Sequence, residues 1–400
     1  MKKRIYLSAP ALICCAGNNR NELYENCLSG NQGGLAMRVM PGCDGEYPVG
    51  LISGELPEAS IEGQGICEPQ NYAGGSRIIR IINAALEQLR PAVEKALAKY
   101  SPKRIGVCLG SCDNGSEASL MAHNFFIEKN VFPEDYDLCF QSASFSAEFA
   151  ASKFGLGGPV LTIATACASG ASAIMRGAEL IRSGFCDAVI AGGADIVSQT
   201  VFSGFHALEA ISDSLTNPFS KNRKGINLGE GAAFFLLEAE KNSGVEFLGA
   251  GESADAYHMT APGTDGTGPA KAMNAALKDA GITSGQIAYV NLHGTGTELN
   301  DKAESLAMKS VFGDIPPPAS STKPVTGHTL GAAGALEAAI CWMVLTEQKG
   351  LPVHCWDGVK DEEAPFYPAD GSCRQTPSIC MSNSFAFGGC NVSLILGRDT

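Results

Sequence analysis

The sequence predicts a layered α/β fold, and three observations support that prediction. Short apolar runs typical of buried strands alternate along the chain with longer segments of helical periodicity. Hydrophobic residues make up 45% and charged residues 18% of the chain, which is typical of a compact globular protein. Glycine is abundant at 47 of 400 residues but follows no three-residue repeat, so it indicates tight turns and close packing.

The expected strands are short, mostly apolar runs. They cover Arg104–Gly110, Val160–Ala164, Ala188–Gly192 and Ala233–Glu238. The apolar stretch after Met1–Arg4 is also interpreted as a strand rather than a signal peptide, because Ser8 and Pro10 interrupt it and no cleavage site follows. The expected helices cover Ser76–Leu89, Ser169–Ser183, Pro269–Ala280, Asp301–Phe312 and Gly331–Glu347.

A turn-like segment, Lys241–Gly244, divides the chain into an N-terminal half, residues 1–243, and a C-terminal half, residues 244–400. One helix start in each half resembles the other. Segment 165–173 aligns with segment 326–334 at Thr, Gly and Ala, and this alignment places Cys167 opposite His328. We therefore predict a duplicated fold in which each half supplies one catalytic group.

Net charge and cysteine content restrict the function classes. Lys and Arg total 29 against 42 Asp and Glu, and the resulting charge of −13 argues against nucleic-acid binding and against a broad anionic-membrane surface. The 15 cysteines include no C-x-x-C pairs at zinc-ribbon spacing, so we expect no metal site and favour the reducing cytoplasm. No apolar stretch is expected to span a membrane.

Cys167 is the first candidate for chemistry. It follows the apolar run VLTIA and lies at the start of the predicted helix Ser169–Ser183. Backbone N–H groups and the helix dipole favour an anion there, so we expect a depressed thiol pKa and a thiolate ready to attack a carbonyl. The alternative for a free cysteine is a small buried hydrophobe.

Two of the six histidines lie in loops rich in Gly and Thr. His293 begins the segment HGTGT, and His328 follows KPVTG, ahead of a small-residue helix that carries Glu337. Glycines in such loops let a ligand approach the backbone, and two imidazoles there suit acyl chemistry, although a single histidine is usually structural.

The segment SNSFAFGGCN, residues 382–391, precedes the apolar run VSLIL. It is either a tight turn or a backbone oxyanion donor beside a mobile aromatic side chain. In the second case Gly388 and Gly389 supply the flexibility.

Together these motifs resemble a known family. TACASGASA, HGTGT followed by Asp301 and Glu304, KPVTGHTLGAAGALEA and SNSFAFGGCN stand in the order and at the spacing seen in β-ketoacyl-[acyl carrier protein] synthases of the elongating Cys-His-His type. The resemblance covers most of the chain from about Arg77 onward. It implies a thiolase fold, with five αβαβα layers built from two similar halves, and usually a dimer.

The resemblance also implies the reaction and its residues. The reaction is a decarboxylative condensation of malonyl-acyl carrier protein with an acyl group on a cysteine, which extends the chain by two carbons without a metal or nucleotide cofactor. Cys167 resembles the acylated nucleophile, and His293 and His328 resemble the pair that serves decarboxylation. Lys323 and Glu337 resemble the adjacent lysine and the carboxylate that anchors this network.

Three further positions are implied by the same resemblance. Thr295 and Thr297 resemble the pantetheine contacts. Phe387 resembles the gating phenylalanine, whose backbone N–H joins that of Cys167 in the oxyanion hole.

Some segments depart from the family pattern. The usual V-x-x-T-G-x-G opening is replaced by Ile5–Ala11, and the usual R-P-F-D and R-D-G-F segments appear as Asn217–Ser220 and Arg223–Ile226. Ala386 and Cys390 replace the frequent Gly and Thr of the gating loop. These departures suggest a specialised bacterial pathway, such as an aryl polyene or another type II polyketide route, rather than housekeeping fatty-acid synthesis. The dimer partner is then either an identical subunit or a homologous chain-length-factor-like subunit.

Other functions stay open at this point. A thiolase-type acyltransferase shares the implied fold, and Cys390 beside Gly-Gly resembles a second thiolase cysteine, although HGTGT and K-P-x-x-G-H favour the synthase. A priming-type synthase carries Asn where this chain has His328. A nonenzymatic chain-length-factor subunit typically lacks the nucleophile that Cys167 provides.

The implied substrates arrive on an acidic acyl carrier protein, so a chain with a charge of −13 needs a local basic patch. Arg77 and Arg80 lie three residues apart on the predicted helix Ser76–Leu89 and share one face. They are the expected docking residues, and the alternative is that both are simply solvated.

Overall fold

The computed structural model describes residues 2–59, 76–113, 115–134, 136–364, 368 and 377–399. The N-terminal half contributes the strands β1 (Tyr6–Leu7), β2 (Ala11–Cys14), β5 (Ile105–Gly110), β6 (Val160–Ile163), β7 (Ala188–Asp195) and β8 (Gly231–Glu238). The C-terminal half contributes β9 (Val245–Ala254), β10 (Tyr289–Asn291), β11 (Ala319–Ser320), β12 (Ile379–Phe385) and β13 (Cys390–Arg398). A separate hairpin contains β3 (Ala36–Val39) and β4 (Glu46–Val49).

The strands of the two halves form one continuous hydrogen-bonded path. Its order is β11-β10-β12-β13-β9-β1-β8-β7-β5-β6, and β2 pairs with β8 beside this path. The short strand β1 pairs antiparallel with both β8 and β9, so it joins the two halves. The turn at residues 241–244 lies between β8 and β9, where the chain passes from one half to the other.

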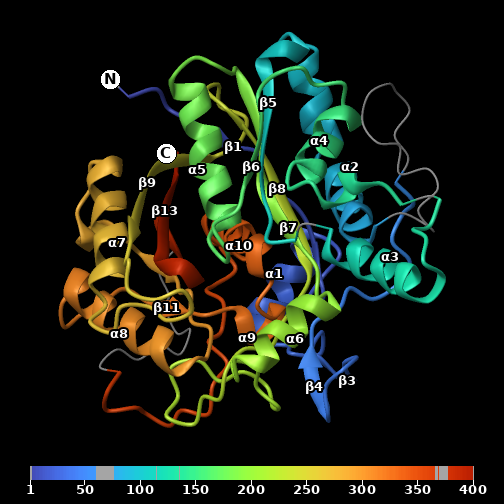
Figure 1. Ribbon diagram of the computed structural model, residues 1–400. Coiled ribbons are helices and arrows are strands. Elements are labelled where there is room, and N and C mark those ends of the chain that lie inside the picture. Colours follow the sequence, from blue (N-terminus) through green and yellow to red (C-terminus); the bar gives the residue numbers. More distant parts are fainter. Residues whose placement is uncertain are drawn as a thin grey trace.

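Helices cover and separate these two groups of strands, which confirms the α/β prediction (Figure 1). One outer layer contains α2 (Arg77–Leu97) and α4 (Phe145–Lys153), and the other contains α7 (Thr267–Ala280) and α8 (Glu298–Phe312). Between the two groups of strands lie α5 (Ser169–Arg182) and α10 (Ala333–Glu347). The order helix, sheet, helix, sheet, helix gives the five expected layers.

Shorter helices connect the layers and flank the site. The remaining α-helices are α1 (Arg20–Ser29), α3 (Ser116–Lys129), α6 (Gln199–Ala207) and α9 (Lys323–Thr326). Single 3₁₀ turns cover Pro102–Arg104, Leu138–Gln141, Ser284–Gln286, Leu330–Ala332 and Phe387–Gly389.

The expected elements are present, with two differences. Helix α2 continues through Pro91 to Leu97, although proline usually ends a helix, because the apolar face continues beyond it with buried Val93 and Ala96. The expected helix Gly331–Glu347 begins as a 3₁₀ turn and becomes α-helical at Ala333.

The central layer contains a segment that differs from the sequence-based expectation about membrane spans. Leu330–Glu347 is apolar and long enough to cross a membrane by length and composition, but 89% of it is buried inside the protein. It is the core helix α10 with its preceding turn, packed between the two groups of strands.

Close packing of α5 against the start of α10 depends on Gly170. A Cβ added there would lie 2.7 Å from the carbonyl oxygen of Gly331, whereas a Cβ added at Gly204 in α6 would meet nothing within 4 Å. We expect Gly170→Ala to lower the free energy of unfolding by about 1–3 kcal/mol through this overpacking. Gly204→Ala is the matched control and is expected to leave stability unchanged or raise it by up to about 1 kcal/mol. Urea denaturation of both variants measures the difference, and equal stabilities would contradict the packing argument.

Candidate active site

Cys167 lies on a sharp turn between β6 and α5. Ala166 has a φ of 48°, which is uncommon for a residue with a side chain, and it turns the chain so that Cys167 faces a cavity at the start of the helix. Ser169 fixes this turn from both sides. Its Oγ accepts from the Thr165 N–H at 2.9 Å and donates to the Ala166 carbonyl at 2.6 Å.

The cavity has a volume of about 400 Å³ and receives side chains from both halves of the chain. Its lining includes the sequence-predicted residues Cys167, His293, Thr295, Thr297, His328 and Phe387. The structure therefore brings together residues that are more than 200 positions apart in the sequence. Thr295 and Thr297 stand side by side on its wall, with their hydroxyl oxygens 3.0 Å apart.

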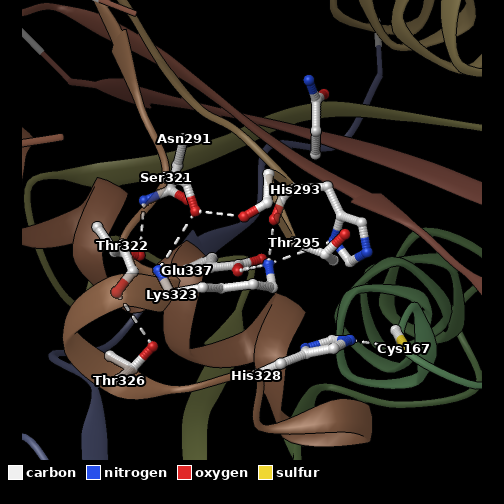
Figure 2. A network of polar contacts seen from close by, with 12 residues as sticks. Cys167, Asn291, His293, Thr295, Ser321, Thr322, Lys323, Thr326, His328 and Glu337 are labelled. Carbon is white, nitrogen blue, oxygen red and sulfur yellow. Dashed lines mark hydrogen bonds and ion pairs between the residues drawn. The ribbon is translucent and has the colours of Figure 1, made fainter. Parts of the chain in front are cut away.

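Cys167 and His328 are in direct contact. The thiol Sγ lies 3.0 Å from His328 Nε2, and both residues are buried (Figure 2). The backbone N–H of His328 donates to the Asn227 carbonyl at 2.7 Å, which holds the imidazole in place. Burial, followed by the nearby charge of Lys323, keeps the pKa of His328 well below 6.5, so this imidazole is neutral and is able to accept the thiol proton.

The expectation of a depressed thiol pKa at Cys167 is wrong for this structure. Burial raises the pKa of the thiol to about 12, and Asp195 adds to that effect. Lys323 and the backbone N–H groups of Phe387 and Cys167 act in the opposite direction without offsetting burial. The resting group is therefore a thiol, and it becomes nucleophilic when its proton passes to His328.

His293 is held by a buried lysine and carboxylate. Lys323 Nζ lies 3.3 Å from His293 Nδ1, and it also donates to the His293 carbonyl and to Glu337 Oε1 (Figure 2). An ammonium group only donates, so Nδ1 must accept and the ring proton must sit on Nε2. Burial, then Lys323 and His328, hold the pKa of His293 well below 6.5. His293 thus presents a neutral imidazole with an Nε2–H donor, and its ring centroid lies 5.4 Å from that of His328.

Two buried carboxylates shape the loop that carries His293. Glu304 accepts from the N–H groups of His293 and Gly294 at 2.9 and 2.7 Å. Asp301 accepts from Gly296 at 3.2 Å and from Phe219 at 2.8 Å. The acidic residues that follow HGTGT in the sequence therefore fix the backbone around His293 rather than face the cavity.

Phe387 closes one wall of the cavity. Its ring lies 5.6 Å from that of Phe205 on α6, and its backbone N–H points toward the Cys167 thiol closely enough to stabilise the thiolate. Gly388 and Gly389 follow with φ values of 84° and 76°, which few other residues adopt. The amides of Cys167 and Phe387 both lower the pKa of the thiol, and the oxyanion-hole role expected of them stays a prediction.

Sequence reasoning missed Asp195 at the end of β7. Its buried carboxylate accepts from Ser111 Oγ at 3.0 Å, from the Cys112 and Asp113 amides, and from the Gly331 amide in the turn after His328. No local pattern marks such a residue, because its partners come from two distant segments, residues 111–113 and the turn at Gly331. Among the described residues, no group of three or more His, Cys, Asp or Glu is placed to hold a metal ion.

Arg77 and Arg80, the predicted carrier-docking residues, both make hydrogen bonds within this chain. Arg77 Nε donates to buried Glu230 at 2.8 Å, and Arg80 donates to the Leu56 carbonyl. Both guanidinium groups are half-buried and satisfy groups of this chain. The carrier-docking role of these two arginines stays a prediction.

Comparisons with known proteins agree with this geometry. The model of the beta-ketoacyl synthase N-terminal domain matches residues 65–243, and the model of the C-terminal domain matches residues 245–355. A 3-oxoacyl-[acyl-carrier-protein] synthase 2 of Vibrio cholerae is 38% identical over 316 residues, which cover 74% of this chain and 76% of the relative. A Staphylococcus aureus protein of the same name is 30% identical over 418 residues, with 99% and 98% of the two chains covered.

A solved structure extends the similarity to three dimensions. It is described as the ketosynthase ApeO in complex with its chain length factor ApeC from Xenorhabdus doucetiae, and its matching chain has 38% sequence identity and a TM-score of 0.89. The alignment covers 99% of this chain and 98% of that chain. Full-length similarity, both domain models and the cysteine and two histidines around one cavity show that this chain belongs to the β-ketoacyl synthase family and has the thiolase fold.

Proposed function

We propose that this protein catalyses a decarboxylative Claisen condensation in which Cys167 carries the acyl group and His293 and His328 serve the malonyl unit. The observation that carries the proposal is the 3.0 Å contact between Cys167 Sγ and His328 Nε2, in a cavity shared with the oriented imidazole of His293. The matched family is that of the synthases, so the thiolase alternative is not proposed.

In the first half-reaction, an acyl group moves from a carrier-bound thioester to Cys167. The Cys167 sulfur forms a bond to the acyl carbon while its proton passes to His328, and the carrier thiol leaves and takes up that proton. Charge on the carbonyl oxygen develops between the N–H groups of Cys167 and Phe387, where preorganised donors lower the barrier. A base is required because the thiol is protonated at neutral pH.

In the second half-reaction, malonyl-carrier protein loses carbon dioxide and leaves an enolate. The Nε2–H of His293 donates to the enolate oxygen, and Lys323 keeps that proton on Nε2 by occupying Nδ1. The enolate carbon then bonds to the acyl carbon on Cys167 as the bond from that carbon to sulfur breaks, and the departing cysteine thiolate takes up a proton from water. Thiol, imidazole and amide groups supply every step, so we infer that no metal or nucleotide cofactor takes part.

The pKa values of the two histidines predict their protonation state. Both are held well below 6.5, so both imidazoles stay neutral until the pH falls through the lowered pKa. Burial raises the pKa of Glu304 and of Glu337 to about 7, so an inflection of kcat near that pH would report on these carboxylates as well. We therefore expect NMR of the imidazole nitrogens to show His293 and His328 neutral between about pH 6 and about pH 8. An imidazole that titrates with the ordinary histidine pKa would contradict a neutral pair.

We infer that the substrates arrive on the phosphopantetheine arm of an acyl carrier protein and that Thr295 and Thr297 contact this arm. Both threonines line the same cavity as Cys167, and their hydroxyl groups offer hydrogen bonds to the amide groups of such an arm.

We also infer a dimer. Strand β6 ends the strand path, and no strand of the described residues pairs with its outer edge. Leu161 on this strand is 38% exposed. Met121, Phe125 and Ile127 on α3 are exposed apolar side chains as well, which is unusual for a surface without a partner. The partner is an identical subunit or a chain-length-factor-like homologue, and similarity to ApeO supports the second choice and an aryl polyene or related pathway. We propose the cytoplasm as its location, since its relatives are named as synthases that act on acyl-carrier-protein substrates.

Incubation of the purified protein with acyl-carrier and malonyl-carrier protein tests the function. The expected products are carbon dioxide and a β-ketoacyl-carrier protein two carbons longer than the starter. A panel of starters, followed by intact-protein mass spectrometry, identifies the acyl group that the enzyme accepts. Absence of any elongated product across the panel, with the carrier proteins verified as substrates for another synthase, would contradict the proposal.

A further inference from the structure

We propose that His354 is a positioning residue that holds the His293 loop in place for the malonyl half-reaction. The inference rests on the proposed function and concerns a residue outside the cavity. His354 follows α10 in the sequence and lies in none of the motifs that carry the family resemblance.

His354 uses both ring nitrogens within the protein. It is 6% exposed, its Nδ1 accepts from the Ser321 N–H at 3.0 Å, and its Nε2 donates to the Pro218 carbonyl at 3.1 Å. An amide N–H only donates and a carbonyl only accepts, so these contacts define a single neutral tautomer. Burial lowers the pKa of His354 to about 4, which keeps that tautomer present at working pH. The ring is therefore a fixed link between two segments.

The first segment leads directly to His293. Ser321 Oγ donates to the Gly294 carbonyl at 2.7 Å and accepts from the Lys323 N–H at 3.3 Å. Gly294 follows His293, and Lys323 holds His293 Nδ1, as Figure 2 shows for the contacts around Ser321 and Lys323. Ser321 contacts both Gly294 and Lys323, and these two residues hold His293. By fixing the backbone of Ser321, His354 therefore fixes both of these contacts.

The second segment reaches the same loop from the other side. Pro218 precedes Phe219, whose φ of 62° is unusual for an aromatic residue, and the Phe219 N–H donates to Asp301. The ring of Phe219 packs so closely on Gly294 that a Cβ added there would lie 3.0 Å from it. Gly294 packs between Ser321 and Phe219, and His354 holds Ser321 directly and Phe219 through the preceding Pro218.

This arrangement also accounts for a departure from the family pattern. Where the family commonly has R-P-F-D, this chain has Asn217 and Ser220 at the outer positions, and both contact Asp357. Asn217 Oδ1 accepts from the Asp357 N–H at 3.1 Å, and Ser220 Oγ donates to the Asp357 carboxylate at 2.7 Å. Segments 217–220 and 354–357 are therefore joined by several hydrogen bonds. His354 also connects them to Ser321.

The contacts predict a selective effect. His354 touches Ser321 and Pro218 but has no hydrogen bond to Cys167 or His328, which are held by the α5 turn and by Asn227. Loosening His354 should therefore impair steps that need His293 while leaving acyl transfer to Cys167 intact. A role confined to stability would affect both half-reactions together.

Three substitutions test this in the full-length protein with carrier-bound substrates. His354→Phe removes both contacts, His354→Asn offers an oxygen to Ser321, and His354→Gln offers an N–H to Pro218. For His354→Phe we expect kcat for decarboxylation and condensation to fall about tenfold or more, with the rate of Cys167 acylation within about twofold of wild type. His354→Asn should recover to within about threefold because it restores the link to Ser321, whereas His354→Gln should resemble His354→Phe. The control Lys278→Gln changes an exposed side chain on α7, in the opposite outer layer from α3, and should leave all rates unchanged.

Equal losses in both half-reactions, or an unchanged condensation rate in His354→Phe, would overturn the inference. Ser321→Ala provides an independent variant if His354→Phe does not fold. It removes the hydroxyl that joins the Ser321 turn to Gly294 and should reproduce the selective loss, so a wild-type condensation rate in Ser321→Ala would also overturn it. Failure of the wild-type protein itself to condense would overturn the proposed function.

Discussion

Replacing Cys167 with alanine is expected to abolish acyl-enzyme formation and to lower condensation by about a thousandfold or more, because it removes the covalent nucleophile. The fold should persist, because alanine is small and Cys167 lies in a turn fixed by Ser169 rather than by the thiol. Intact-protein mass spectrometry measures the acyl adduct, and circular dichroism checks the fold.

Two further substitutions make this result specific. Cys390→Ala removes a cysteine beside the gating glycines and is the matched control, so it should acylate like the wild type. Cys167→Gln places a side-chain carbonyl near the N–H groups of Cys167 and Phe387, where it imitates the thioester, and malonyl decarboxylation should continue without condensation. Loss of the adduct in Cys390→Ala but not in Cys167→Ala would contradict the assignment.

His293→Ala should lower decarboxylation and condensation by about a hundredfold or more while Cys167 still becomes acylated. The physical reason is that His293 supplies the Nε2–H donor for the enolate, whereas the thiol proton goes to His328. Rapid-quench measurement of the two half-reactions separates the effects.

His328→Ala provides the comparison for that result. His328 contacts the thiol directly, so its loss should retain only some acylation and should also reduce condensation. Equal reductions of both half-reactions in His293→Ala would show that the two imidazoles do not divide the work as proposed.

The strand and helix pattern predicted the elements that position the site. The local alignment of segments 165–173 and 326–334 predicted that each half supplies one catalytic group, Cys167 and His328, but not their direct contact. Repeated motifs carry this information because each begins a small-residue helix of the central layer. The motif HGTGT likewise predicted His293 as a catalytic residue.

Other features depend on contacts between distant segments and had no local signal. The pKa of Cys167 was predicted with the wrong sign because the helix start favours an anion while burial, which the local sequence does not show, disfavours it more. Arg77 has the pattern of a surface residue, yet Glu230, 153 positions away, occupies its guanidinium. Asp195 and His354 act on backbone groups, and residues of this kind are found only when the fold is known.

A pulse-chase measurement tests the central claim that Cys167 and His293 serve successive steps in one cavity. The enzyme is first acylated with an isotope-labelled acyl-carrier protein, freed of excess carrier, and then mixed with unlabelled malonyl-carrier protein. Peptide mapping should place the label on Cys167 alone, and the chase should transfer it to the β-ketoacyl product in wild type but leave it on Cys167 in His293→Ala. Label on another residue, or label on Cys167 that malonyl-carrier protein cannot discharge in the wild type, would contradict the account.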